Sequence, residues 1–365
     1  MKARITALLT LGLALLCGCA LAFDLSPYEL MADSTVCPLS RDAYVQVVSD
    51  ENAHQITLHT PAGVTRAGQR AAGGDVLSPF VLSGGTIGFF RTEAVIGNGT
   101  QRQLVLWRSD GTFAEPVALD QELKSLSSAG EAIAGYADGV LHILDPRGRE
   151  TGAVRVTDGE RASSYLNTFA ANGDGYLAAV FAEDRREGVC GVDIISIDGD
   201  GRKIWQTYLP DNANNTYGAL TGDGAGGAYF MKADDSDYKV GRLFAMDGSG
   251  TPRWEKTIAF DGLILSRALL GWDGEAVTVD ACGVSKSKGV YDVVHLRISP
   301  EGELISATAK DFSCRPDYSF ALRRAADGTI FAESSAGYLE TRGTKHVLVP
   351  ADALPDIAAP KVIVE

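Results

Sequence analysis

The chain has 365 residues, 45% of them hydrophobic, which is enough for one large folded domain. It carries 33 basic and 47 acidic residues, so its formal net charge is −14. Because phosphate groups bind to basic surfaces, this charge argues against nucleic acid as a partner.

Residues 1–22 have the pattern of an export signal. Lys2 and Arg4 precede the apolar run from Ile5 to Leu16, which is too short to cross a bilayer as a stable helix. Leu16-Cys17-Gly18-Cys19 resembles a bacterial lipobox, with Cys19 as the lipidated residue. The competing site, after Ala22, would release a secreted protein. Both sites predict an extracytoplasmic protein whose membrane attachment depends on the lipid alone.

Three segments follow the signal. Residues 23–41 are polar and are expected to be a tether, residues 42–349 contain repeats, and residues 350–365 are expected to be a tail or a closing strand. The last repeat needs one more strand, which we expect either the segment before Arg41 or the tail at Val362 to supply. In the repeats, a turn glycine follows each short apolar run, at Gly63, Gly111, Gly148, Gly201, Gly250, Gly302 and Gly343. The spacings of 37 to 53 residues are typical of four-stranded propeller blades. We therefore expect an all-β chain with a single β-propeller of seven blades, with six or eight as the alternatives.

Two of the repeats share a fuller pattern. Asp198-Gly199-Asp200-Gly201 is followed by Trp205, and Asp247-Gly248-Ser249-Gly250 is followed by Trp254. This pattern resembles the repeat of pyrroloquinoline-quinone-like β-propellers, a group that includes quinoprotein dehydrogenases and an assembly-scaffold lipoprotein. The resemblance implies that the glycine makes the turn and the tryptophan packs between blades. It does not imply the quinone cofactor, because the chain after the signal lacks the adjacent cysteine pair of those dehydrogenases.

Four cysteines follow the signal, namely Cys37, Cys190, Cys282 and Cys314. An even number of cysteines in an exported protein permits disulfides. Cys282 and Cys314 each follow a strand of the same repeat, and these two strands run in the same direction in an up-and-down sheet. We therefore predict a disulfide between Cys282 and Cys314.

The carboxylates at the ends of the first apolar runs are the main candidate site. We interpret these runs as the innermost strands, so their acids would form a rim around the propeller axis at Asp50, Glu93, Asp138, Glu183, Asp234, Asp280 and Glu333. Such a rim would attract a basic segment of a partner or a hard divalent cation, calcium or magnesium rather than zinc. Ordinary polarity at the ends of strands is the alternative explanation.

The sequence contains none of the common catalytic motifs, such as HExxH, GxSxG or a P-loop. Its five histidines are scattered, although His142 and His295 occupy similar places in their strands. We therefore expect a monomeric, non-enzymatic binding or scaffolding module without a cofactor, whose partner is a protein or glycan of the cell envelope. The alternative is a hydrolase or lyase acting on glycans or peptidoglycan, with a carboxylate pair in the central cleft.

Overall fold

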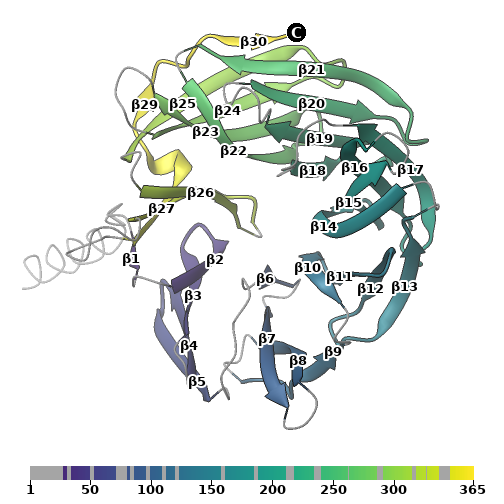
Figure 1. The fold of residues 1–365 in the computed structure, drawn as a ribbon. Coiled ribbons are helices and arrows are strands. Elements are labelled where there is room, and N and C mark those ends of the chain that lie inside the picture. The colour runs from purple at the N-terminus through teal and green to yellow at the C-terminus, as the bar shows by residue number, and fades with distance from the viewer. Residues whose placement is uncertain are drawn as a thin grey trace, which may run out of the picture.

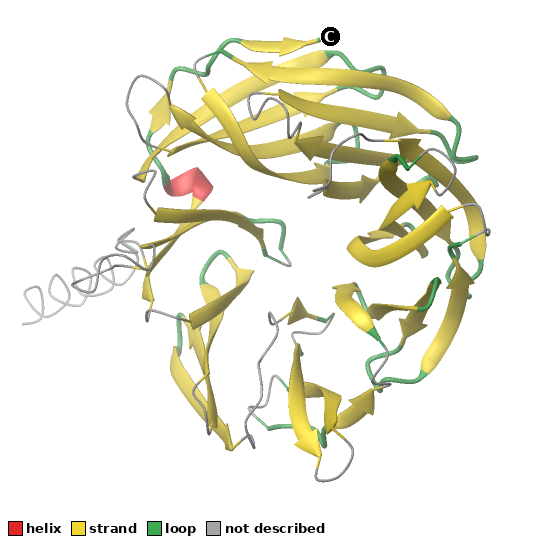
Figure 2. Ribbon diagram, viewed as in Figure 1, coloured by secondary structure: helices red, strands yellow, loops and turns green. Residues whose placement is uncertain are grey.

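A computed structural model describes residues 28–30, 34–49, 53–70, 80–82, 86–95, 99–108, 112–119, 123–157, 161–184, 188–210, 218–233, 240–261, 263–285, 291–314, 318–325, 327–336 and 346–365. Nearly all of its regular elements are strands (Figure 2). The part of the chain described here has no helix long and apolar enough to cross a membrane. The proposed lipobox at Cys19 lies outside the described residues.

The strands form seven antiparallel sheets arranged in a ring, which we call blades 1 to 7 (Figure 1). Blade 1 contains β2 (Ser34–Ser40), β3 (Ala43–Ser49), β4 (Ala53–Thr60) and β5 (Gly63–Arg70). Blade 2 contains β6 (Phe80–Val81), β7 (Ile87–Val95), β8 (Gly99–Trp107) and β9 (Val117–Leu119). Blade 3 contains β10 (Lys124–Ala129), β11 (Ala132–Ala137), β12 (Val140–Leu144) and β13 (Glu150–Arg155).

The second half of the chain builds the other four blades. Blade 4 contains β14 (Arg161–Asn172), β15 (Gly175–Asp184), β16 (Cys190–Ile197) and β17 (Lys203–Pro210). Blade 5 contains β18 (Gly218–Gly222), β19 (Ala228–Ala233), β20 (Val240–Met246) and β21 (Pro252–Phe260). Blade 6 contains β22 (Leu263–Trp272), β23 (Val277–Ser285), β24 (Tyr291–Ile298) and β25 (Leu304–Cys314). Blade 7 contains β26 (Tyr318–Arg324), β27 (Ile330–Ala336), β28 (His346–Pro350) and β1 (Tyr28–Leu30). The expectation of an all-β propeller with seven blades is confirmed.

The first strand of each blade lies nearest the axis. Figure 1 shows these strands around the centre of the ring, and β14 contacts both β10 and β18 while β22 contacts both β18 and β26. The acid-ended runs are therefore the second strands of their blades, and their interpretation as innermost strands is wrong. Each acid-ended run is preceded by a turn and an earlier strand. That earlier strand is short or irregular in several blades and has a weak apolar pattern, so the sequence did not reveal it.

The N-terminal segment closes the ring. β1 pairs antiparallel with β28, with Glu29 opposite Val347, and so supplies the fourth strand of blade 7. β2 is the innermost strand of blade 1. The described parts of residues 23–41 therefore belong to the propeller rather than to a tether. Pairing of one chain end with the other removes an open sheet edge, which would otherwise invite association.

The C-terminal segment runs along the outside of blades 6 and 5. After the 3-10 helix η2 (Ala351–Ala353), β29 (Asp356–Ile357) pairs with β25 and β30 (Val362–Val364) pairs with β21. Figure 1 shows β30, in yellow, along the outer edge of blade 5. We call residues 351–365 the strap. The strap adds a fifth strand to two complete blades and leaves the closure of blade 7 to β1.

The repeated turns join the third and fourth strands. In blade 5, Gly250 donates its backbone N–H to Asp247 O at 2.9 Å, and Asp247 Oδ1 accepts the backbone N–H groups of Ser249 and Thr251. Gly250 has a φ of 82°, which an L-residue rarely adopts. The aspartate and the glycine are therefore both required by the geometry of this turn.

The two repeat tryptophans connect neighbouring blades. Trp254 of blade 5 donates its indole N–H to Pro300 O in blade 6 at 2.7 Å. A Cβ atom on Gly250 would lie 2.7 Å from the ring of Trp205 in blade 4. Each tryptophan thus packs under the turn of the next blade, where only glycine leaves room for the ring.

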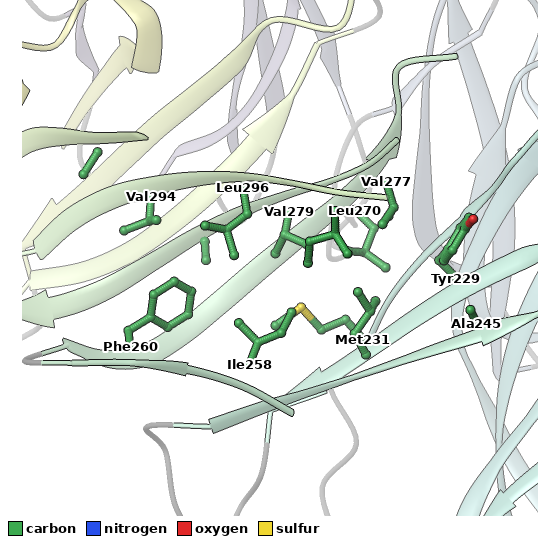
Figure 3. Packing of buried hydrophobic residues seen from close by; sticks show 14 residues of the cluster. Tyr229, Met231, Ala245, Ile258, Phe260, Leu270, Val277, Val279, Val294 and Leu296 are labelled. Atoms are coloured by element: carbon green, nitrogen blue, oxygen red, sulfur yellow. The ribbon is translucent and has the colours of Figure 1, made fainter. Parts of the chain in front are cut away.

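Apolar clusters fill the spaces between blades. The cluster between blades 5 and 6 includes Met231, Ile258, Phe260, Val279 and Leu296 (Figure 3). Its residues come from alternate positions of their strands, as expected when one face of a sheet is buried against another. One face of blade 6 is therefore packed with apolar side chains, whereas its opposite face carries polar ones.

Candidate functional site in the pocket between blades 6 and 7

The two faces of blade 6 differ in chemistry. Val277, Val279 and Ala281 of β23 pack in the apolar cluster against blade 5. The intervening side chains of Thr278 and Asp280 point to the other face, because side chains alternate along a strand. Polar groups at a packed interface are costly unless they are hydrogen-bonded, so this half of the interface between blades 6 and 7 is unusual.

Asp280 is the buried centre of the site. The residue is only 4% exposed, and it pairs with His295 across the β23–β24 ladder. Its Oδ1 accepts a hydrogen bond from His295 Nδ1 at 2.7 Å, and its Oδ2 accepts one from Arg324 Nη2 at 3.2 Å. A buried carboxylate is stable when two such donors replace the water it has lost.

Arg324 reaches this carboxylate from blade 7. It is the last residue of β26, and its guanidinium lies against the backbone of β22 at Gly271. A Cβ atom at Gly271 would come within 2.8 Å of Arg324 Nη2 and of Thr278 Oγ1. Gly271 therefore provides the space through which an arginine of one blade contacts an aspartate of the next.

A pocket of about 410 Å³ opens beside this group. Val293, Ile330 and Ala351 contribute apolar surface to it, and Trp272, His295 and Arg324 line it as well. These side chains come from β22, β24, β26 and β27, and Ala351 comes from the strap. A volume within about 300–1,000 Å³ is usual for a small-molecule site.

The other acids of this pocket are engaged by the protein. Asp273 Oδ2 accepts a hydrogen bond from Arg297 Nε at 2.6 Å, and its Oδ1 accepts the backbone N–H groups of Glu275 and Ala276. The bond from Arg297 and these backbone donors lower the pKa of Asp273 to about 2. Asp352 of the strap pairs with Arg41. The pocket thus holds carboxylates that are already paired within the protein, next to the partly exposed guanidinium of Arg324.

A second pocket lies between blades 2 and 3, on the face of blade 3 toward the preceding blade. It has a volume of about 310 Å³ and contains His142, whose Nδ1 lies 2.6 Å from Glu150 Oε2. Asp138, with a φ of 46°, also lines it. This pocket has no arginine in its lining, which makes it the simpler of the two and a natural reference for the first.

The seven expected rim acids do not share one environment. Asp280 and Glu333 are buried and ion-paired, Glu333 with Arg323 Nε at 2.6 Å, whereas Asp138 and Glu183 are exposed. Asp280 and Glu333 lie at the fourth positions of β23 and β27, but Glu183 lies near the end of β15. Asp50 and Asp234 lie outside the described residues, as does the side chain of Glu93.

The innermost strands have the opposite charge from the one expected. As described here, the first strands of the seven blades contain no Asp or Glu, and they carry the basic residues Lys124, Arg161, Arg267, Arg323 and Arg324. Within the described residues, no group of three or more His, Cys, Asp or Glu side chains could hold a metal ion. The structure therefore gives no support to a calcium-binding acid rim.

The predicted disulfide has an unfavourable geometry. Cys282 lies in β23 opposite Val293, and Cys314 ends β25 opposite Tyr291, so β24 separates the two strands. Two strand spacings amount to about 9.6 Å, which exceeds the roughly 7 Å that a disulfide allows between Cα atoms. No disulfide is present in the described part of the chain, and the Cys282–Cys314 link stays a prediction.

Sequence reasoning identified Asp280 as a candidate but assigned it the wrong partners, and it missed Arg324. The available signal was the alternation of apolar and polar residues in both Val277–Cys282 and Val293–Ile298. Two neighbouring strands with this pattern predict one polar face, although they do not show which blade packs against it.

The ring of seven sheets and its closure by β1 define the chain as a seven-bladed β-propeller. Searches found no matching protein-family model and no matching curated protein. Solved structures do match, among them a eukaryotic initiation factor, with 10% identity over 93% of this chain and 89% of that chain and a TM-score of 0.50. The β-propeller domain of the Trilobed protease from Pyrococcus furiosus matches with 13% identity over 86% and 97% and a TM-score of 0.47.

Longer proteins also match. An acylaminoacyl peptidase matches with 12% identity and a TM-score of 0.49, and the match covers 90% of this chain but only 52% of the peptidase. Identities at this level establish a shared fold and no shared activity.

Proposed function

We propose that this chain is an exported binding module of the cell envelope, which acts as a monomer and holds a ligand in the pocket between blades 6 and 7. The observation that carries this proposal is the Asp280–His295–Arg324 group, a buried carboxylate that orients the partly exposed side chains of His295 and Arg324 beside the pocket. Its partner is a protein or glycan of the envelope, and membrane attachment comes from the lipid at Cys19.

The state of the carboxylates supports binding over hydrolysis. A glycoside hydrolase needs a carboxylic acid that holds its proton near the working pH, beside a second carboxylate. Asp273 has the opposite property, because Arg297 and two backbone N–H groups lower its pKa to about 2. Each oxygen of Asp280 accepts one hydrogen bond, from His295 and from Arg324. These groups are suited to organising a rigid binding surface.

A pocket-filling variant tests the proposal. Thr308 lies opposite His295 in the sheet and is exposed at the pocket, so Thr308→Trp should block the pocket without disturbing the core. Ile305 is 51% exposed on the same strand and does not line the pocket, so Ile305→Trp is the matched control. The full chain would be immobilised and exposed to a detergent extract of its native envelope, with crosslinking.

The proposal predicts that wild type and Ile305→Trp capture the same component, and that Thr308→Trp loses it. Capture that survives in Thr308→Trp would place the binding surface elsewhere. Turnover of an envelope glycan by the purified protein, lost in the same variant, would instead favour the hydrolase.

A further inference from the structure

The pocket between blades 6 and 7 is rich in hydrogen-bond donors. Arg324 has five N–H donors, and among the described residues its guanidinium has one hydrogen-bonded partner, Asp280. His295 also lines the pocket with a side chain that is 41% exposed, and its Nδ1 is hydrogen-bonded to Asp280. Asp280 holds both groups in place, so that little side-chain freedom would be lost when a ligand binds.

The acceptors that could have competed for these donors are already occupied. Asp273 is held by Arg297, and Asp352 by Arg41. The pocket therefore has donors in excess, and the group that satisfies them is an anion. A planar guanidinium with two adjacent N–H groups matches a carboxylate in a bidentate geometry.

The apolar part of the lining specifies what stands next to the anion. Val293, Ile330 and Ala351 belong to the apolar cluster between blades 6 and 7, and they also line the pocket. A ligand that satisfies both parts presents a carboxylate next to an aliphatic group. An inorganic anion or a free phosphate leaves the apolar wall uncovered.

The charge of the whole molecule argues against a polyanion. With a formal net charge of −14, the protein repels a chain of uronic acids over a longer range than the pocket attracts it. A ligand with a single carboxylate experiences little of this repulsion and gains all of the local contacts. The C terminus of a peptide has this chemistry when its last side chain is aliphatic.

We propose that the pocket between blades 6 and 7 binds the C-terminal carboxylate of a peptide or protein that ends in an aliphatic residue. The guanidinium of Arg324 holds the carboxylate beside His295, and Val293, Ile330 and Ala351 contact the terminal side chain. This inference rests on the proposed function, since it names the partner class of the same pocket.

Calorimetric titration of the full chain with four probes tests the assignment. The probes are the tripeptide Gly-Gly-Leu with a free C terminus, the same tripeptide with an amidated C terminus, galacturonate, and inorganic phosphate. Replacement of the carboxylate by an amide removes a charge-assisted pair, so the acid should bind at least about 10-fold more tightly than the amide. Galacturonate and phosphate should bind no better than the amide.

Two adjacent arginines provide a matched pair of variants. Arg324→Gln should weaken binding of Gly-Gly-Leu by about 10-fold or more. Arg323 precedes it on the same strand, pairs with Glu333 and does not line the pocket, so Arg323→Gln should change the affinity by less than about 2-fold. Because Arg324→Gln also removes a partner of Asp280, His295→Gln is the second variant, with His142→Gln in the other pocket as its control.

Equal binding of the acid and the amide would overturn the carboxylate assignment. Tighter binding of galacturonate would transfer the site to acidic glycans, and equal binding of phosphate would reduce it to an anion site; both outcomes refute the peptide proposal. If Thr308→Trp abolishes capture of the envelope component while Gly-Gly-Leu does not bind, the pocket is functional but its ligand class is wrong. If Thr308→Trp has no effect on capture, the proposed function itself fails.

Discussion

His295 Nδ1 donates a hydrogen bond to Asp280 Oδ1 at 2.7 Å between directly opposed residues of β23 and β24. Arg324 of blade 7 donates to the other oxygen of the same carboxylate at 3.2 Å. One buried aspartate thereby couples two strands of blade 6 to the first strand of blade 7. The candidate site is thus also part of the interface that holds the ring together.

Replacement of Asp280 by asparagine should destabilise the fold. The change removes two charge-assisted hydrogen bonds in a buried place, which should cost about 2–4 kcal/mol in the free energy of unfolding. Asp138→Asn is the control, because Asp138 is exposed, and it should cost less than about 0.5 kcal/mol. Urea unfolding at neutral pH would measure both, and equal effects of the two substitutions would contradict the role of Asp280.

Stability should depend on Asp273 at low pH. Arg297 and the backbone donors lower the pKa of Asp273 from an ordinary 3.8 to about 2 in the folded protein. A lowered folded-state pKa stabilises the protein above the unfolded-state value, and this contribution is lost as the pH falls from about 4 to 2. Thermal unfolding at pH 5 and pH 2.5 should therefore show a smaller acid loss in Asp273→Asn than in wild type. The same acid loss in both proteins would refute this assignment.

Alanine substitutions at two turn glycines should distinguish the stability cost of backbone strain from the cost of disturbed packing between blades. Gly224 and Gly250 have φ values of 74° and 82°, but only at Gly250 would an added Cβ atom meet a neighbouring blade, at the ring of Trp205. Gly224→Ala should cost about 1–2 kcal/mol from the left-handed backbone alone. Gly250→Ala should cost about 2–4 kcal/mol, since the methyl group also displaces the tryptophan. Chemical denaturation would compare them, and a Gly250→Ala cost no larger than that of Gly224→Ala would argue against packing between the blades.

Removal of residues 24–31 should weaken the closure of the ring. This deletion takes away β1 and exposes the edge of β28, so blade 7 retains three strands. Deletion of residues 361–365 removes β30 from a blade that already has four strands, and it should lower Tm by less. Differential scanning calorimetry would rank the two deletions. A larger loss from the second deletion would contradict closure by β1.

Processing at Cys19 can be tested in the native host. If Cys19 is lipidated, the wild-type protein should fractionate with membranes, and Cys19→Ala should move it to the soluble fraction. Mass spectrometry of the mature N terminus should find a modified cysteine. An unmodified chain that begins at Phe23 would show cleavage after Ala22 and secretion instead.

Local features of the sequence determined the fold class and the number of blades. An aspartate and a glycine three residues apart, such as Asp247 and Gly250, are readable because the turn that needs them lies within five residues. The alternation along Val277–Cys282 is readable for the same reason, since it reflects the pleat of one strand. A repeat of local patterns was therefore sufficient to predict a ring of small sheets.

Tertiary structure alone decided which strand is innermost, which segment closes blade 7, and which residues meet in the pocket. Asp280 and Arg324 are separated by 44 positions and belong to different blades. Their contact depends on how two sheets pack and on the missing side chain of Gly271, and neither leaves a pattern along the chain. The sequence therefore did not distinguish the buried, ion-paired carboxylates from the exposed ones. Burial and ionic partners are properties of the assembled sheets rather than of the strand that carries the residue.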